Sequence, residues 1–155
     1  MVTEGRFRVG YHPALGLLLG LLAGIGLDYL RPLPSTPWPL GLRLAFGLPP
    51  LLLSLALAGW GLVALRAART PFEPGHTPRA LVVAGPFRFS RNPLYLAQIL
   101  LLAGLGQAAF PWLLPIAVLQ ALLLDRLAIP REEQALAETF GEDFAAYRAR
   151  VRRWI

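Results

Sequence analysis

Two short polar stretches carry the side chains with the clearest chemical use. In the first, Asn92 and Pro93 are followed two residues later by Tyr95. Proline favours the first position of a helix and keeps the residue before it out of the α conformation, so a helix is predicted to begin at Pro93. Asn92 is then either the N-cap of that helix or, together with Tyr95, part of a pocket for a polar ligand.

The second stretch is Pro130-Arg131-Glu132-Glu133. Acidic residues are favoured in the first turn of a helix by the helix dipole, which is the simpler interpretation. The alternative is a carboxylate held near a membrane to bind a cation or an ammonium group. Successive helical residues point about 100° apart, so Glu132 and Glu133 are expected to have different roles, with one facing inward and its neighbour solvated.

Few other residue types capable of chemistry are present. The chain of 155 residues has no Cys, which excludes disulfides, thiolate metal sites and a Cys nucleophile. The two histidines, His12 and His76, are far apart in the sequence, and no metal site is predicted. Dinucleotide-binding loops, phosphate-binding loops and the order of a Ser-His-Asp triad are also missing from the sequence.

The composition is that of an integral membrane protein. Hydrophobic residues make up 55% of the chain and charged residues 15%, against about 25% charged in ordinary soluble domains. The net charge is +6 and every basic residue is Arg. Because the arginines lie between apolar runs rather than in one basic stripe, nucleic acid is not an expected partner, and the lipid bilayer is.

The apolar runs predict an all-α, polytopic membrane helix bundle that forms a single domain over residues 1–155. About 20 apolar residues cross a bilayer as a helix. Approximate spans are expected at 13–30, 44–65, 93–110 and 112–127. Pro49-Pro50 predicts a kink or a late helix start in the second span. The last two spans are short and are expected to form a tight hairpin.

Arginine placement predicts the orientation of these spans. Thirteen of the fifteen arginines lie in the N-terminal tail, the 66–92 loop and the C-terminal segment, and only Arg31 and Arg43 lie in the first loop. The positive-inside rule therefore places both termini in the cytoplasm, for a protein of the cell inner membrane. Asp28, at the end of the first span, is expected to pair with Arg31.

After the last span, apolar residues recur every three or four positions. This spacing predicts an amphipathic helix over 131–153 that lies at the cytoplasmic surface, with Phe144, Tyr147, Val151 and Trp154 on its apolar face. Gly141 is expected to interrupt that helix.

Three segments together resemble one enzyme family: Gly85-Pro-Phe-Arg-Phe-Ser-Arg-Asn-Pro-Leu-Tyr95, Gly104-Leu-Gly106 and residues 132–147. They look like the isoprenylcysteine carboxyl methyltransferases, and the related phospholipid methyltransferases share the pattern. The resemblance implies an integral membrane methyltransferase that uses S-adenosyl-L-methionine. The acceptor would be a lipid-like or small apolar molecule, methylated on a carboxyl oxygen. The alternatives are phospholipid N-methylation and a non-catalytic four-helix transporter or scaffold; the oligomeric state is left open.

The resemblance also implies positions for the site residues. The cofactor would contact Arg79, Ala80, Leu81, Val82, Phe87, Asn92, Pro93, Leu94, Tyr95, Gly104, Gly106 and Glu132. Asn92 stands where many members have a titrating His, so that proton-transfer role is excluded. Prenylcysteine enzymes carry a substrate-orienting Arg four residues before the first Glu, which here is Ala128, so prenylcysteine is a doubtful acceptor. Arg126 and Arg131 are the candidate catalytic replacements, and an amine or hydroxyl acceptor would need Glu132, Glu133 or Tyr95 as its base.

Overall fold

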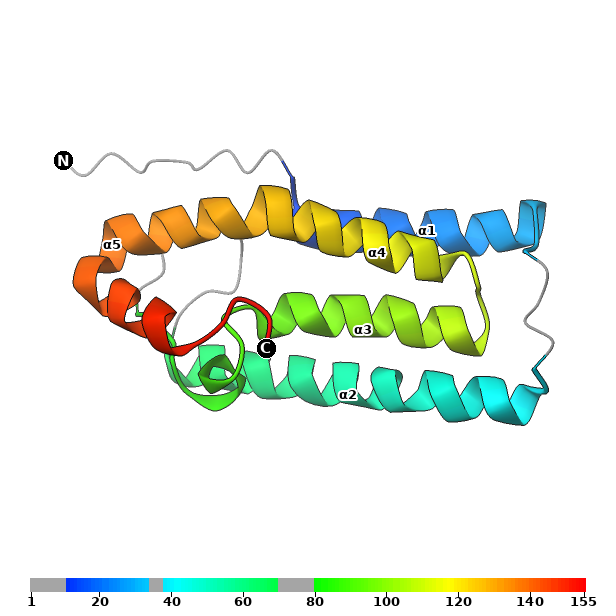
Figure 1. Ribbon diagram of the computed structural model, residues 1–155, viewed down its shortest axis with the longest axis horizontal. Coiled ribbons are helices and arrows are strands. Elements are labelled where there is room, and N and C mark those ends of the chain that lie inside the picture. Colours follow the sequence, from blue (N-terminus) through cyan, green and yellow to red (C-terminus); the bar gives the residue numbers. More distant parts are fainter. Residues whose placement is uncertain (1–10, 34–37, 70–79) are drawn as a thin grey trace.

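The computed structural model describes residues 11–33, 38–69 and 80–155, and every regular element in these ranges is helical. Figure 1 shows the helices side by side in a bundle, with a C-terminal extension at one end. In chain order they are α1 (Pro13–Leu30), α2 (Leu40–Ala67), the 3-10 helix η1 (Gly85–Arg88), α3 (Pro93–Ala108), α4 (Leu113–Leu123), the π-helical turn η2 (Leu124–Ala128) and α5 (Ile129–Arg150).

Three helical runs are long and apolar enough to cross a membrane. They are α1, α2 and the continuous run Leu113–Arg150, whereas α3 is a shorter apolar helix. Large apolar side chains point away from the bundle on these helices, with Leu22 62% and Leu55 66% exposed. Such a surface is stable in lipid rather than in water. The predicted class, a polytopic membrane helix bundle, is therefore confirmed, with three candidate spans and a short α3; the third candidate run carries no charge before Asp125, so its membrane part is the α4 end.

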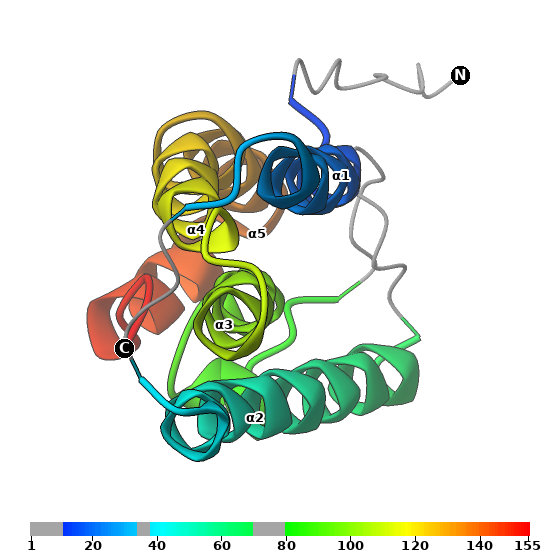
Figure 2. The same ribbon diagram turned by 90° about the vertical axis from the view of Figure 1, so that its right-hand side faces the viewer.

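Helix α3 lies at the centre of the bundle, between α2 and α4, and α1 lies beside α4 (Figure 2). Two glycines allow this close packing. A Cβ atom on Gly104 would lie 2.9 Å from the backbone oxygen of Gly47 on α2, and one on Gly106 would lie 2.9 Å from the backbone nitrogen of Leu114 on α4. The second contact closes the predicted hairpin of the last two spans.

Two predicted boundaries are wrong. Helix α2 begins at Leu40 and continues through Pro49 and Pro50, so the late start is not observed, although Figure 2 shows α2 bending along its length, as internal prolines predict. The expected break between 112–127 and 131–153 is absent as well, because α4 passes through η2 directly into α5. Pro130 is tolerated there because the π-helical turn just before it already interrupts the regular hydrogen-bond pattern.

The C-terminal helix is amphipathic and interrupted at Gly141, as predicted. Gly141 has φ 50°, and the chain turns back after it towards the start of α3 (Figure 1). Phe144 and Tyr147 are buried while Glu142 and Arg148 are exposed. The helix nevertheless ends at Arg150, and Val151 is extended, so the expected helix to residue 153 is wrong in its last turn.

Candidate functional site

The centre of the site is a contact between the third residue of α3 and the first turn of α5. The hydroxyl group of Tyr95 donates a hydrogen bond to Oε1 of Glu132. Tyr95 is buried in an apolar cluster with Leu124, Ala128 and Ile129, against which Trp154 packs. The structure thus joins the two polar stretches that were singled out in the sequence. They are brought together because α4 returns alongside α3 and leads directly into α5, whose first turn lies near the start of α3.

Glu132 has an unusual electrostatic environment. It lies in α5, beyond the uncharged run that ends at Leu124. Burial raises the pKa of Glu132 to about 7, and the hydrogen bond from Tyr95 offsets only part of this effect. A carboxyl group that is only partly ionised at neutral pH gains most when an ammonium or another cation binds beside it.

Glu133 faces different partners, so neither glutamate is the solvated neighbour that was expected. Its carboxylate accepts from Arg91 Nη2 at 2.6 Å and from Arg153 Nη2 at 2.9 Å, and its side chain is 11% exposed. Burial would raise the pKa of Glu133, but the hydrogen bonds from Arg153 and Arg91 outweigh it, and the pKa lies below the usual value. With both oxygens bound by guanidinium groups, Glu133 is poorly suited to act as a base.

Asn92 occupies the N-cap position of α3, but its side chain does not cap the helix. Instead its Nδ2 donates to the backbone oxygen of Arg153 at 3.0 Å, and its own N–H is bonded to Ser90 Oγ at 3.1 Å. This corrects the prediction of a side-chain N-cap. The contact fixes the orientation of the amide group, because only the nitrogen can donate to a carbonyl.

Arg91, which was not singled out from the sequence, belongs to this site. Its Nη1 donates to the carbonyls of Arg148 and Val151, and its Nη2 to Glu133, while its buried Nε has no partner in the part of the chain that is described. A buried N–H without a partner is costly. This Nε is therefore one donor still available for an anionic group beside the Arg91–Glu133 pair.

The other residues expected to contact the cofactor are placed less directly. Gly104 and Gly106 pack against neighbouring helices and leave no room for a ligand at their Cα atoms. Leu94 faces α2, where a Cβ on Gly61 would lie 2.8 Å from its Cδ2. Pro93 is buried in the first turn of α3.

The segment before α3 holds the remaining positions. Ala80, Leu81 and Val82 are half-buried in the approach to η1, and Phe87 accepts a hydrogen bond from Tyr147 through its backbone oxygen, at 2.8 Å. Arg79 lies outside the described residues.

The candidate substrate arginines do not reach the Tyr95–Glu132 contact. The Arg126 side chain is 78% exposed and lies 3.7 Å from Asp125, and Arg131 is exposed. Ala128, where the prenylcysteine enzymes carry Arg, is 1% exposed within the Tyr95 cluster. A larger charged side chain would not fit at that position in this packing.

A buried polar chain beside Tyr95 was also missed from the sequence. Tyr11 donates to Gln120 Oε1 at 2.7 Å, and Gln120 Nε2 donates to Gln98 Oε1 at 3.1 Å. Tyr11 packs against the Tyr95 cluster. A single glutamine in an apolar helix does not by itself indicate a functional site, because such residues also form hydrogen bonds that hold membrane helices together.

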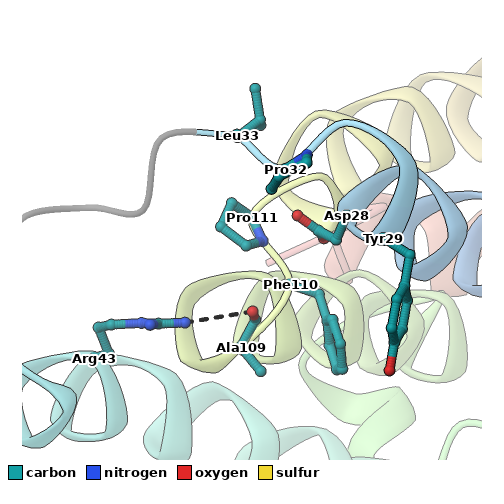
Figure 3. A pocket seen from close by; sticks show the side chains of 8 residues that line it. All are labelled: Asp28, Tyr29, Pro32, Leu33, Arg43, Ala109, Phe110 and Pro111. Carbon is teal, nitrogen blue, oxygen red and sulfur yellow. Dashed lines mark hydrogen bonds between the residues drawn. The ribbon is translucent and has the colours of Figure 1, made fainter.

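A hollow lies at the opposite end of the bundle from the Tyr95–Glu132 contact (Figure 3). This pocket of about 270 Å³ is formed by the end of α1, the start of α2 and the turn between α3 and α4. Arg43 donates to the backbone oxygen of Ala109 at 3.3 Å, and Asp28 accepts the N–H of Trp112 at 3.3 Å instead of forming the expected pair with Arg31. The carboxylate of Asp28 thus meets the N-terminus of α4, and the guanidinium group of Arg43 meets the C-terminus of α3, so each charge is opposite in sign to the helix end that it contacts. None of the predicted site residues lines this pocket.

Comparison with known proteins gives one match. The sequence model described as phospholipid methyltransferase matches residues 42–143, about two thirds of the chain. No curated protein and no solved structure matches. The matched region includes Asn92, Tyr95 and both glutamates, and it ends before the last residues that contact them.

Proposed function

The chain belongs to the phospholipid methyltransferase family, and we propose that it transfers a methyl group from S-adenosyl-L-methionine to a lipid-like acceptor held in the bilayer. The observation that carries this proposal is the Tyr95–Glu132 contact, in which a half-buried carboxylate lies where the membrane bundle meets the C-terminal helix.

The donor set fits the amino acid part of this cofactor. An α-ammonium group needs an acceptor such as Glu132, and an α-carboxylate needs a donor such as the buried Nε of Arg91. Bound there, the cofactor supplies an electrophilic methyl group on a sulfonium centre. The task left to the protein is alignment of the acceptor, which positioning groups provide without a strong acid or base.

The acceptor is proposed to be an amine of a phospholipid rather than a prenylcysteine carboxylate. A carboxylate would be oriented by a nearby cation, but Ala128 is buried and Arg126 and Arg131 point into solvent. An amine acceptor reacts as the free base and needs no such orienting cation. Carboxyl O-methylation remains the second candidate, with Arg126 or Arg131 as the orienting charge after a rotamer change.

The test is a radiolabelled methyl-transfer assay with the protein in lipid nanodiscs. Phosphatidylethanolamine vesicles, a fatty acid and a farnesylated cysteine are offered separately. Labelled phospholipid supports the proposal, and labelled methyl ester supports the second candidate. Failure of the cofactor to bind in a calorimetric titration would favour the non-catalytic transporter or scaffold.

A further inference from the structure

The last described residues form a strap across the start of α3. In this C-terminal strap, Val151–Trp154, three backbone carbonyls accept hydrogen bonds from Arg91 and Asn92, the two residues just before α3. The carbonyl of Val151 accepts from Arg91 Nη1 at 2.9 Å, that of Arg152 from the Arg91 N–H at 3.0 Å, and that of Arg153 from Asn92 Nδ2 at 3.0 Å.

Charged side chains fasten the strap on its other side. Arg153 Nη2 binds Glu133 at 2.9 Å and Arg153 Nη1 binds Asp125 at 3.2 Å, and Trp154 Nε1 donates to the same Asp125 oxygen at 3.1 Å. Asp125 lies in the π-helical turn η2, an irregular helix type that is frequent at functional sites. A chain of alternating charges thus runs from Asp125 through Arg153 and Glu133 to Arg91.

Asn92, Arg91, Glu132 and Tyr95, the polar side chains of the proposed cofactor site, contact this strap or lie next to a residue that does. The Arg153 carbonyl orients Asn92. The other two guanidinium nitrogens of Arg91 are hydrogen-bonded, and only its Nε has no partner among the described residues. Glu132 directly precedes Glu133 in α5, and Trp154 packs on the Tyr95 cluster. Helix packing alone would satisfy none of these hydrogen bonds, because the strap lies beyond the end of α5 and is not helical.

We propose that the C-terminal strap, fastened by Arg153 to Asp125 and Glu133, is a positioning element of the cofactor site. It sets Asn92 with its nitrogen towards the strap and its oxygen available as an acceptor, and it presents Arg91 Nε. Arg153 and Asp125 are positioning residues that act through Asn92, Arg91 and Glu133. This inference rests on the proposed function, because it concerns the binding of that cofactor.

The test compares Arg153→Gln with Arg152→Gln, which makes the same charge change on the exposed neighbouring side chain. Calorimetric titration with S-adenosyl-L-methionine is expected to show at least a tenfold rise in Kd for Arg153→Gln and less than a twofold change for Arg152→Gln. Arg153→Lys, which keeps the charge, should recover part of the loss. If Arg153→Gln does not fold, Asp125→Asn is the substitute, because Asp125 binds the strap from outside the proposed cofactor contacts.

A double-mutant cycle separates positioning from general stability. If the strap acts through Asn92, the loss in Arg153→Gln/Asn92→Ala is smaller than the sum of the two single losses. Additive losses, or wild-type affinity in Arg153→Gln, would overturn the proposal.

Hydrogen exchange provides a readout that needs no cofactor. The Arg91 N–H, bonded to the strap, should exchange faster in Arg153→Gln than in Arg152→Gln, and unchanged exchange would contradict the proposal. If the wild-type protein binds no cofactor, the proposed function fails, and the positioning inference is rejected with it even where the exchange difference is found.

Discussion

Glu132 and Glu133 are adjacent in the chain, yet their surroundings give them opposite electrostatic properties. Glu132 is half-buried against a neutral hydroxyl group and has a raised pKa, whereas Glu133 lies between two guanidinium groups and has a lowered pKa. The angle of about 100° between successive helical residues separates their environments. The carboxylate of Glu132 can therefore still bind a cationic ligand, whereas that of Glu133 is already bound by Arg91 and Arg153.

Replacing these two residues should therefore have different consequences. Glu132→Gln keeps the shape and removes the charge, and a hydrogen bond to a charged group contributes about 1.5–3 kcal/mol, so cofactor affinity should fall about tenfold to a hundredfold. Glu133→Gln breaks ion pairs with Arg91 and Arg153 and should mainly lower the thermal unfolding midpoint. Calorimetric titration and thermal unfolding of both variants check this. Equal, near-native affinity in both would remove Glu132 from the site.

The raised pKa of Glu132 predicts a pH dependence of binding. The ammonium partner requires the ionised carboxylate, so affinity should rise with pH as Glu132 loses its proton around pH 7. Binding should be about fivefold weaker at pH 6 than at pH 7, a range in which an α-amino group with a pKa of about 7.7–8.0 stays charged. Titrations from pH 5.5 to 7 test this, and the slope should vanish in Glu132→Gln. A wild-type profile as flat as that of the variant would contradict the prediction.

At the scale of helices, the position of the site depends on how closely α3 approaches α2. Gly47 and Gly104 face each other across this contact, and Ser54 on α2 donates to the backbone oxygen of Ala97 on α3 at 2.7 Å. Small residues and side-chain hydrogen bonds are what hold helices together in a bilayer. Gly104 therefore acts in packing, and it affects the site through the position of α3.

Adding one methyl group tests this packing role. In Gly104→Ala the new Cβ would lie 2.6 Å from Leu51 Cγ and 2.9 Å from a backbone oxygen, and such overpacking costs about 1–3 kcal/mol. The thermal unfolding midpoint should fall, while the cofactor affinity of the folded protein changes little. Gly59→Ala on the exposed face of α2, where no atom lies within 4 Å, is the control and should not lower the midpoint. A large loss of affinity without a loss of stability would instead support a cofactor contact at Gly104.

The elements were predictable from the sequence to the extent that local patterns determine them. The start of α3 at Pro93 and the break at Gly141 follow from backbone preferences that act within a few residues. The uninterrupted passage from α4 to α5 did not follow, because it depends on a π-helical turn that has no residue signature here. The role of Arg153 was equally hidden, since Arg152 beside it has the same chemistry and only the folded chain distinguishes them.

At the scale of the whole molecule, the two ends of the bundle differ in character. The start of α3, α5 and the strap gather at one end, and the pocket of Asp28 and Arg43 lies at the other (Figures 1 and 3). The helices alternate in direction, so the beginning of α1 and the end of the chain lie at the same end (Figure 1). The proposed cofactor site must face the compartment that contains the cofactor, which ties the proposed function to the orientation in the membrane.

The excess of arginines at the site end predicts that this end faces the cytoplasm. The chain has no Cys, so single cysteines report position without a background. Ala149→Cys places an exposed thiol near the strap, and Gly41→Cys places one at the opposite end, where no atom lies within 4 Å of the glycine. A membrane-impermeant maleimide added to intact cells should label Gly41→Cys and leave Ala149→Cys unlabelled until the membrane is permeabilised. The reverse pattern would show that the Tyr95–Glu132 contact faces away from the cytoplasm and its S-adenosyl-L-methionine, and would contradict the proposed function.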